Sequence, residues 1–249
     1  MANTLKNIHN MKKFIFLILL SAFLFPQCHS AQTVEAEIFY LKREPKIKIE
    51  NPPLLILLHG LGSNENDLFG LVQHLPDSLL ILSLRAPRTI REGSYRWYDL
   101  QWIDGIPKGN VAELEESRDM LIRFIENLHK KHKFDKQKVF LGGFSQGAVM
   151  SLSVALKKPE LLKGVLFLSG KMPDGAEAVA DKKENYKKLK IFMSHGTEDK
   201  VLTIEDARLV KSFLEKHNFP IEYHEFPMPH TINRETLASL VYWLKKSMR

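Results

Sequence analysis

The stretch Gly143-Phe144-Ser145-Gln146-Gly147 decides the fold of this sequence. It ends an apolar run, Lys138–Phe144, that predicts a strand, and it opens a predicted helix of small residues, Gln146–Lys157. A G-x-S-x-G turn between a strand and a helix is a nucleophile elbow, which raises a serine hydroxyl on a tight turn. The flanking glycines let the strand and the helix approach each other without Cβ clashes. This context favours a nucleophilic Ser145 over a serine in an ordinary glycine-rich turn.

The rest of the chain alternates between predicted strands and predicted helices. The other predicted strands are Val34–Tyr40, Leu54–Leu58, Leu79–Leu84, Lys163–Leu168, Lys190–Ser194 and Ile221–Phe226. The other predicted helices are Ala112–His132, a helix capped by Thr203 that reaches about His217, and Asn233–Met248. Continuous apolar runs are typical of parallel strands that helices cover on both faces. The sequence therefore predicts an α/β fold with a mostly parallel central sheet and helices on both faces.

A serine hydroxyl needs a base to take its proton and an acid to orient that base. In folds with this elbow the partners follow the serine in the order acid, then histidine. Asp199 comes just after the predicted strand Lys190–Ser194, with Glu198 as the adjacent alternative. His230 comes after the predicted strand Ile221–Phe226 and before the last predicted helix. We therefore predict Ser145 as nucleophile, Asp199 as acid and His230 as base.

The negative oxygen that forms during such a reaction needs two hydrogen-bond donors, the oxyanion hole. One donor is the backbone N–H of the residue after the nucleophile, here Gln146. The second is expected from the loop after an early strand, and Leu61 in His59-Gly60-Leu61-Gly62 is the candidate. His59 and His195 each precede a glycine at a strand end, so we expect them to stabilise loops and not to act as bases.

Several motifs in order carry a resemblance to a known family. They are Leu58-His59-Gly60-Leu61-Gly62-Ser63, Arg85-Ala86-Pro87, Trp97-Tyr98-Asp99, Gly143-Phe144-Ser145-Gln146-Gly147-Ala148, Leu168-Ser169-Gly170 and His195-Gly196-Thr197-Glu198-Asp199. With them the chain, from about Leu54 onward, resembles the phospholipase/carboxylesterase family of α/β hydrolases, which includes the acyl-protein thioesterases.

The resemblance implies the α/β-hydrolase fold, the triad Ser145, Asp199 and His230, and an oxyanion hole made by Leu61 and Gln146. It also implies that Trp97 and Asp99 lie near the cleft as substrate-binding residues; the alternative for these two is loop packing. One departure is Pro229, because the family usually has glycine before the base histidine. Proline fixes φ and lacks an N–H, so we expect a stiffer loop at His230.

The N-terminus has the pattern of a signal peptide. Lys12 and Lys13 precede the apolar run Phe14–Phe25, which is short for a transmembrane helix. We therefore expect a signal peptide at residues 1–30, with Met11 as a natural start, and a catalytic domain at residues 31–249. Cleavage after Ser30 predicts an exported, periplasmic or secreted protein. The alternative is lipidation of Cys28, which would make a membrane-attached lipoprotein.

Composition excludes several other classes of protein. Residues 1–30 hold three lysines and no acid, so the net charge of +7 falls to +4 without them. The remaining lysines are dispersed and form no basic stripe, which argues against nucleic-acid binding. Cys28 is the sole cysteine, which excludes a disulfide and cysteine-based metal sites. We expect neither a metal nor a cofactor.

These residues predict a serine hydrolase that cleaves carboxylic esters of short to medium acyl chains through an acyl-enzyme. Lys171–Lys188 is short and polar, so no large cap domain is expected. The aromatic stretch Glu92–Asn110 is expected either as a mobile apolar wall or as a loop packed on the domain. Thioesterase or lysophospholipase activity is the alternative on the same scaffold. A peptidase or a non-catalytic binding protein fits less well, since a candidate fills every catalytic role.

Overall fold

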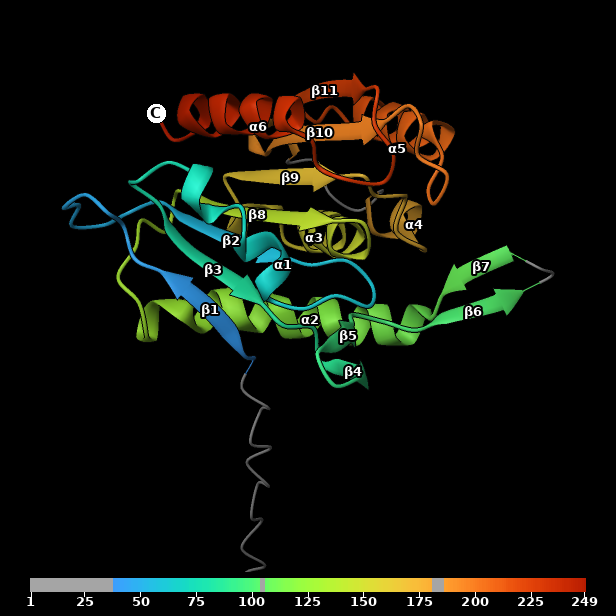
Figure 1. Ribbon diagram of the computed structural model, residues 1–249, viewed down its shortest axis with the longest axis horizontal. Coiled ribbons are helices and arrows are strands. Elements are labelled where there is room, and N and C mark those ends of the chain that lie inside the picture. Colours follow the sequence, from blue (N-terminus) through green and yellow to red (C-terminus); the bar gives the residue numbers. More distant parts are fainter. Residues whose placement is uncertain (1–37, 104–105, 181–185) are drawn as a thin grey trace, which may run out of the picture. The chain divides into compact units, whose positions relative to one another are not determined.

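Apolar runs form the centre of a seven-stranded sheet in the computed structural model, which describes residues 38–103, 106–180 and 186–249 (Figure 1). The strands lie in the order β1-β3-β2-β8-β9-β10-β11. All but β1 run parallel to their neighbours. The parallel strands are β2 (Leu54–Leu58), β3 (Leu80–Leu84), β8 (Val139–Phe144), β9 (Gly164–Leu168), β10 (Lys190–Gly196) and β11 (Ile221–Phe226). The predicted α/β-hydrolase fold with a mostly parallel sheet is confirmed.

Each central strand sends alternate side chains into two separate cores, because successive residues of a strand point to opposite faces. In β2, Leu54, Ile56 and Leu58 join one buried cluster. Leu55 and Leu57 join the other cluster, on the opposite face of the sheet. All five side chains are buried, which explains why the run is apolar throughout rather than alternating.

Helices cover both cores. Residues of α2, α3 and α5 belong to the first cluster, and residues of α1 and α6 belong to the second. Figure 1 shows α1 and α6 on one side of the sheet and α2 and α3 on the other. The helices are α1 (Asn66–Phe69), α2 (Val111–Asn127), α3 (Gln146–Lys157), α4 (Ala176–Ala180), α5 (Ile204–Lys216) and α6 (Arg234–Ser247). Short 3₁₀ turns are η1 (Val72–His74), η2 (Leu128–Lys130), η3 (Pro159–Leu161) and η4 (Tyr186–Lys188).

The start of α5 follows the predicted capping pattern. The Thr203 hydroxyl accepts a hydrogen bond from the Asp206 N–H, and the Asp206 carboxylate accepts one from the Thr203 N–H. This reciprocal pair satisfies donors that a helix start leaves without partners. It fixes where the loop after β10 ends, and that loop contains Asp199.

The first strand differs from the prediction of Val34–Tyr40. The structure has β1 at Tyr40–Arg43, antiparallel to β3, and residues 34–37 lie outside the described part of the chain. An edge strand leaves one side open to solvent, so it tolerates charged residues such as Lys42 and Arg43. Because of these charged residues the segment is not an apolar run, and the sequence pattern placed the strand too early in the chain.

The stretch expected as a loop between β3 and α2 contains two small antiparallel ribbons. They are β4 (Arg88–Arg91) with β5 (Ser94–Arg96), and β6 (Leu100–Ile103) with β7 (Ile106–Gly109). Between the ribbons Trp97 is fully buried and Tyr98 is 2% exposed. These two aromatic residues therefore pack the stretch onto the domain, as the packing alternative predicts.

No helix in the described ranges combines the length and the apolar character needed to cross a membrane. The predicted signal peptide at residues 1–30, with Met11 and Cys28, lies outside the described residues.

Candidate active site

Ser145 occupies a strained turn between β8 and α3. Its backbone has φ 54° and ψ −117°, in a region that non-glycine residues avoid. Such strain persists where the surrounding structure enforces it, and it is common at functional sites. The crowding is visible at Gly147, where an added Cβ would collide with the carbonyl oxygen of Leu58. The elbow thus needs glycine at this position for the helix to pass close to β2.

Asp199 and His230 are in direct contact. Asp199 Oδ2 lies 2.6 Å from His230 Nδ1, although the residues are 31 positions apart in the chain. Asp199 Oδ1 accepts hydrogen bonds from the N–H groups of Val201 and Leu202, at 2.8 and 3.0 Å. The side chain of Asp199 is fully buried and that of His230 is 16% exposed. A carboxylate on Nδ1 fixes the imidazole so that Nε2 is left for a substrate or a nucleophile.

The environment keeps Asp199 ionised. Burial on its own would raise the pKa of the Asp199 carboxyl, because it disfavours the charged form. The hydrogen bonds from His230, Leu202 and Val201 outweigh burial, so the pKa of Asp199 lies below its ordinary value. A permanent negative charge beside the ring can then stabilise an imidazolium at His230.

The ring of Phe144 links the elbow to this pair. Phe144 precedes Ser145, and its ring centroid lies 4.8 Å from that of His230. Among the described residues no hydrogen bond joins the Ser145 hydroxyl to His230. Catalytic hydrogen bonds are often long before substrate binds. The structure thus brings Asp199 and His230 together and places the elbow next to them.

The two predicted oxyanion donors come from neighbouring turns. Gln146 is the first residue of α3, where N–H groups lack a partner within the helix. The N–H of Leu61 has no backbone acceptor in the described part of the chain. The turn carrying Leu61 lies against the elbow, since a Cβ on Gly60 would sit 3.4 Å from Ser145 Cβ. Both N–H groups are therefore available near Ser145.

A buried bridge of hydrogen bonds ties these two turns together. The Gln146 side chain accepts from the Trp97 N–H at 2.9 Å and donates to the Tyr98 carbonyl at 2.8 Å. The Trp97 indole N–H donates to the His59 carbonyl at 2.9 Å. We name these contacts the Gln146–Trp97–His59 bridge. The sequence does not predict this bridge, because its contacts join residues 38 to 49 positions apart with no repeating spacing.

His59 also holds its own loop. Its Nδ1 lies 2.7 Å from the Gly60 carbonyl, and its Nε2 lies 3.0 Å from the Ala86 N–H. These partners require the proton on Nδ1 and the lone pair on Nε2. Burial lowers the pKa of His59, which favours this neutral form. The expected loop-stabilising role of His59 agrees with these contacts.

Trp97 and Asp99 occupy different surroundings. Trp97 is fully buried, and its indole N–H donates to the His59 carbonyl, so the side chain supports the His59 loop from within and is not exposed to a substrate. The Asp99 side chain is 44% exposed and lies 3.0 Å from Arg96. The Asp99 N–H donates to Glu113 on α2 at 2.6 Å. These contacts favour loop packing over substrate contact for both residues.

His195 makes a contact with Asp199 that the sequence did not reveal. As expected it stabilises its loop, since His195 Nε2 lies 2.9 Å from the Leu202 carbonyl. The same nitrogen lies 3.3 Å from Asp199 Oδ2, and both side chains are fully buried. Because the Leu202 carbonyl accepts a hydrogen bond from Nε2, the nitrogen that faces Asp199 carries hydrogen, and His195 is not placed as a base.

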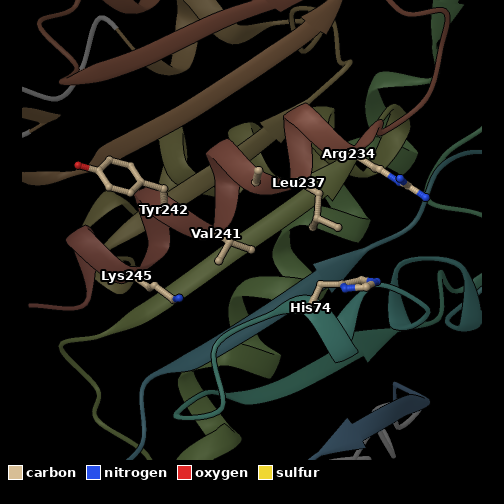
Figure 2. Close-up of a pocket in the computed structure, with 7 residues that line it drawn as sticks. His74, Arg234, Leu237, Val241, Tyr242 and Lys245 are labelled. Carbon is tan, nitrogen blue, oxygen red and sulfur yellow. The ribbon is translucent and has the colours of Figure 1, made fainter.

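Two hollows differ in their relation to this site. A cavity of about 290 Å³ is bordered by His230 and Phe144. A hollow of about 700 Å³ lies over α6, lined by His74, Arg234, Leu237, Ala238, Val241, Tyr242 and Lys245 (Figure 2). None of the predicted triad residues lines the larger hollow, so we place the candidate active site at the elbow. In the described ranges no group of three His, Asp or Glu side chains could hold a metal ion.

Comparison with known proteins identifies similar enzymes. The sequence profile of the phospholipase/carboxylesterase family matches residues 46–248. Acyl-protein thioesterase 1 of Mycosarcoma maydis is 27% identical over 225 residues, which cover 81% of this chain and 94% of the relative. Carboxylesterase SOBER1 of Arabidopsis thaliana is 30% identical over 160 residues, which cover 61% of this chain and 68% of the relative. The crystal structure of a Bacillus cereus carboxylesterase has the same fold, with TM-score 0.70 at 22% identity over 85% of this chain and 95% of that one.

The prediction of an exported, periplasmic or secreted protein is wrong. The fungal relatives that match about four fifths of this chain are acyl-protein thioesterases, and this likeness points away from export. The expectation depended on the composition of the first 30 residues alone, and the rest of the chain carries the likeness.

Proposed function

The chain belongs to the phospholipase/carboxylesterase family of α/β hydrolases, and from this we propose that it cleaves carboxylic esters through an acyl-enzyme on Ser145. It is a carboxylic-ester hydrolase. The observation that carries the proposed mechanism is the 2.6 Å contact between Asp199 and His230 beside a strained nucleophile elbow. That contact orients a base next to the serine that needs it.

The reaction proceeds in two halves. His230 Nε2 takes the proton of Ser145 as the hydroxyl oxygen attacks the ester carbonyl carbon. The carbonyl oxygen becomes negative and receives hydrogen bonds from the N–H groups of Leu61 and Gln146. The C–O bond to the alcohol then breaks, and the alcohol oxygen takes the proton from His230. Water repeats the same steps on the acyl-enzyme, which releases the acid and restores Ser145.

Short to medium acyl chains are the proposed substrates. In its described residues the stretch between β9 and β10 holds α4 and η4, which are single turns of helix and too small for a cap domain. Without the apolar surface of a cap domain, a long acyl chain would stay exposed to water, so short to medium chains fit such a site better.

Thioester cleavage is the alternative on the same residues. Attack on a thioester carbonyl needs the same serine, base and oxyanion donors, and the leaving group is a thiol. The name of the relatives that align along most of the chain, acyl-protein thioesterase 1, fits this second candidate, and the carboxylesterase relatives fit the first.

The test is hydrolysis of p-nitrophenyl esters from acetate to palmitate, by the wild type and by Ser145→Ala. We expect a maximum of kcat/KM at a short or medium chain, and a loss of about 10⁴-fold or more in the variant. Equal activity of folded Ser145→Ala would refute the mechanism. A parallel assay with acyl thioesters of the same chain lengths decides between the two candidate functions.

A further inference from the structure

A cavity beside His230 has one charged wall. It is bordered by Asp67, Leu68, Leu71, Phe144, His230, Thr231 and Ile232. We name it the α1 cavity, because Asp67 and Leu68 belong to α1. Its volume is about 290 Å³, roughly the space of ten water molecules. Leu68, Leu71, Phe144 and Ile232 are apolar, so the cavity can take the hydrocarbon part of a small group.

The position of the α1 cavity assigns it to the leaving alcohol, and this step depends on the proposed function. His230 Nδ1 is held by Asp199 at 2.6 Å, so Nε2 is the nitrogen that gives a proton to the departing oxygen. That oxygen must come within hydrogen-bond reach of Nε2. The carbon substituent on it must then occupy space that borders His230, and the α1 cavity borders His230.

Asp67 gives this space a negative charge. The Asp67 carboxylate accepts a hydrogen bond from the Ser63 hydroxyl at 2.8 Å, which orients it. In the described part of the chain no lysine or arginine forms an ion pair with Asp67. The other residues that border the cavity, apart from His230, are uncharged. The Asp67 carboxylate therefore attracts a cationic leaving group and repels an anionic one.

We propose that the α1 cavity binds the leaving alcohol of the ester, and that Asp67 selects neutral or cationic alcohols over anionic ones. Two unit charges a few ångströms apart near a protein surface interact strongly enough for several-fold discrimination. The Asp67 carboxylate repels an anionic leaving group, and this repulsion contributes to selectivity more than the attraction of a cationic group contributes to affinity. Esters whose leaving alcohol carries a phosphate or a carboxylate group are therefore expected to be poor substrates.

The test compares three butyrate esters that differ in the charge of the alcohol. They are butyrylcholine, its neutral isostere 3,3-dimethylbutyl butyrate, and the butyrate ester of 4-hydroxybutanoate. In the wild type we expect kcat/KM to fall in that order. Asp67→Asn keeps the size of the side chain and removes its charge, so the ratio of cationic to anionic ester should fall about three- to tenfold. The kcat/KM of the neutral ester should change less than that of either charged ester, because it carries no charge for Asp67 to act on.

Asp77→Asn is the matched control. Asp77 is an exposed carboxylate that pairs with Lys46 at 3.1 Å and does not border the cavity. It removes the same charge from the whole molecule, so it should leave the three-ester ratio unchanged. Added salt should reduce the wild-type ratio, because an exposed charge is screened.

A second variant tests the space itself. Leu71→Trp fills the cavity, so it should slow 3,3-dimethylbutyl butyrate more than methyl butyrate. The proposal fails if Asp67→Asn keeps the wild-type ratio, or if Leu71→Trp slows both esters equally. If instead folded Ser145→Ala hydrolyses these esters normally, the proposed function fails, and the two failures are thereby distinguished.

Discussion

At the scale of single residues, the site depends on side chains that hold backbone groups in place. Gln146 has two tasks, because its N–H is a predicted oxyanion donor and its side chain joins the Gln146–Trp97–His59 bridge. The far end of the bridge is the His59 carbonyl, two residues before Leu61. The bridge therefore sets the spacing between the two donors, and a small error in such spacing slows a reaction strongly.

Gln146→Met tests this positioning role. Methionine is close in length to glutamine but makes neither of the two hydrogen bonds, and the backbone N–H of the residue is retained. We expect kcat to fall about tenfold or more while KM changes less than about twofold, since the donors act mainly on the transition state. The measurement is steady-state kinetics of p-nitrophenyl butyrate hydrolysis, normalised to the serine sites that a fluorophosphonate titrates.

Tyr186→Phe is the control for the loss of a buried hydrogen bond. Its hydroxyl donates to the Leu156 carbonyl at 3.1 Å, away from the elbow. This variant should lose about 1 kcal/mol of stability and keep its kcat. An unchanged kcat per titrated site in Gln146→Met would contradict the positioning role.

At the scale of elements, the elbow depends on how closely α3 passes β2. The first turn of α3 contains Gly147, whose Cα faces the carbonyl of Leu58 at the end of β2. Pairing aligns Leu58 with Gly143 on the adjacent strand β8, so the two strands end side by side. The loop that carries Leu61 starts at that end. One close approach thus places the nucleophile and the oxyanion loop together.

Gly147→Ala should disrupt this element. The added methyl group collides with backbone that cannot move without shifting β2, so we expect a loss of about 3 kcal/mol or more, or no folded protein. Gly60→Ala is the matched control for stability, because its Cβ meets Ser145 Cβ at 3.4 Å, close to ordinary contact. It should cost less than about 1 kcal/mol. Urea unfolding followed by circular dichroism compares them, and equal stabilities would show that the close approach is unimportant.

At the scale of the whole molecule, the sequence predicts what depends on local patterns. The apolar run Leu54–Leu58 is a strand with the predicted bounds, because burial on both faces requires a continuous run. Ile221–Phe226 is also a strand with the predicted bounds, but it lies at the edge of the sheet and is only partly buried, so it keeps polar residues. The ribbons between Arg88 and Gly109 were not predicted, because their strands pair with each other and hold many polar residues.

The candidate site likewise has one part that local sequence patterns predict and another part that they do not. Ser145, Asp199 and His230 could be predicted because each follows the end of a strand, β8, β10 and β11 in turn. The contact of His195 with Asp199 and the Gln146–Trp97–His59 bridge arise between segments that meet only in the folded chain. No pattern of spacing or polarity marks such contacts.

The nucleophile is identified by labelling the folded, active protein with an alkyl fluorophosphonate and mapping the adduct by peptide mass spectrometry. This reagent needs an activated serine, so we expect one adduct, on Ser145, with loss of esterase activity in proportion to labelling. His230→Ala should be labelled far more slowly, because the serine loses its base. An adduct on another residue, or labelled Ser145 with esterase activity retained, would show that Ser145 is not the nucleophile.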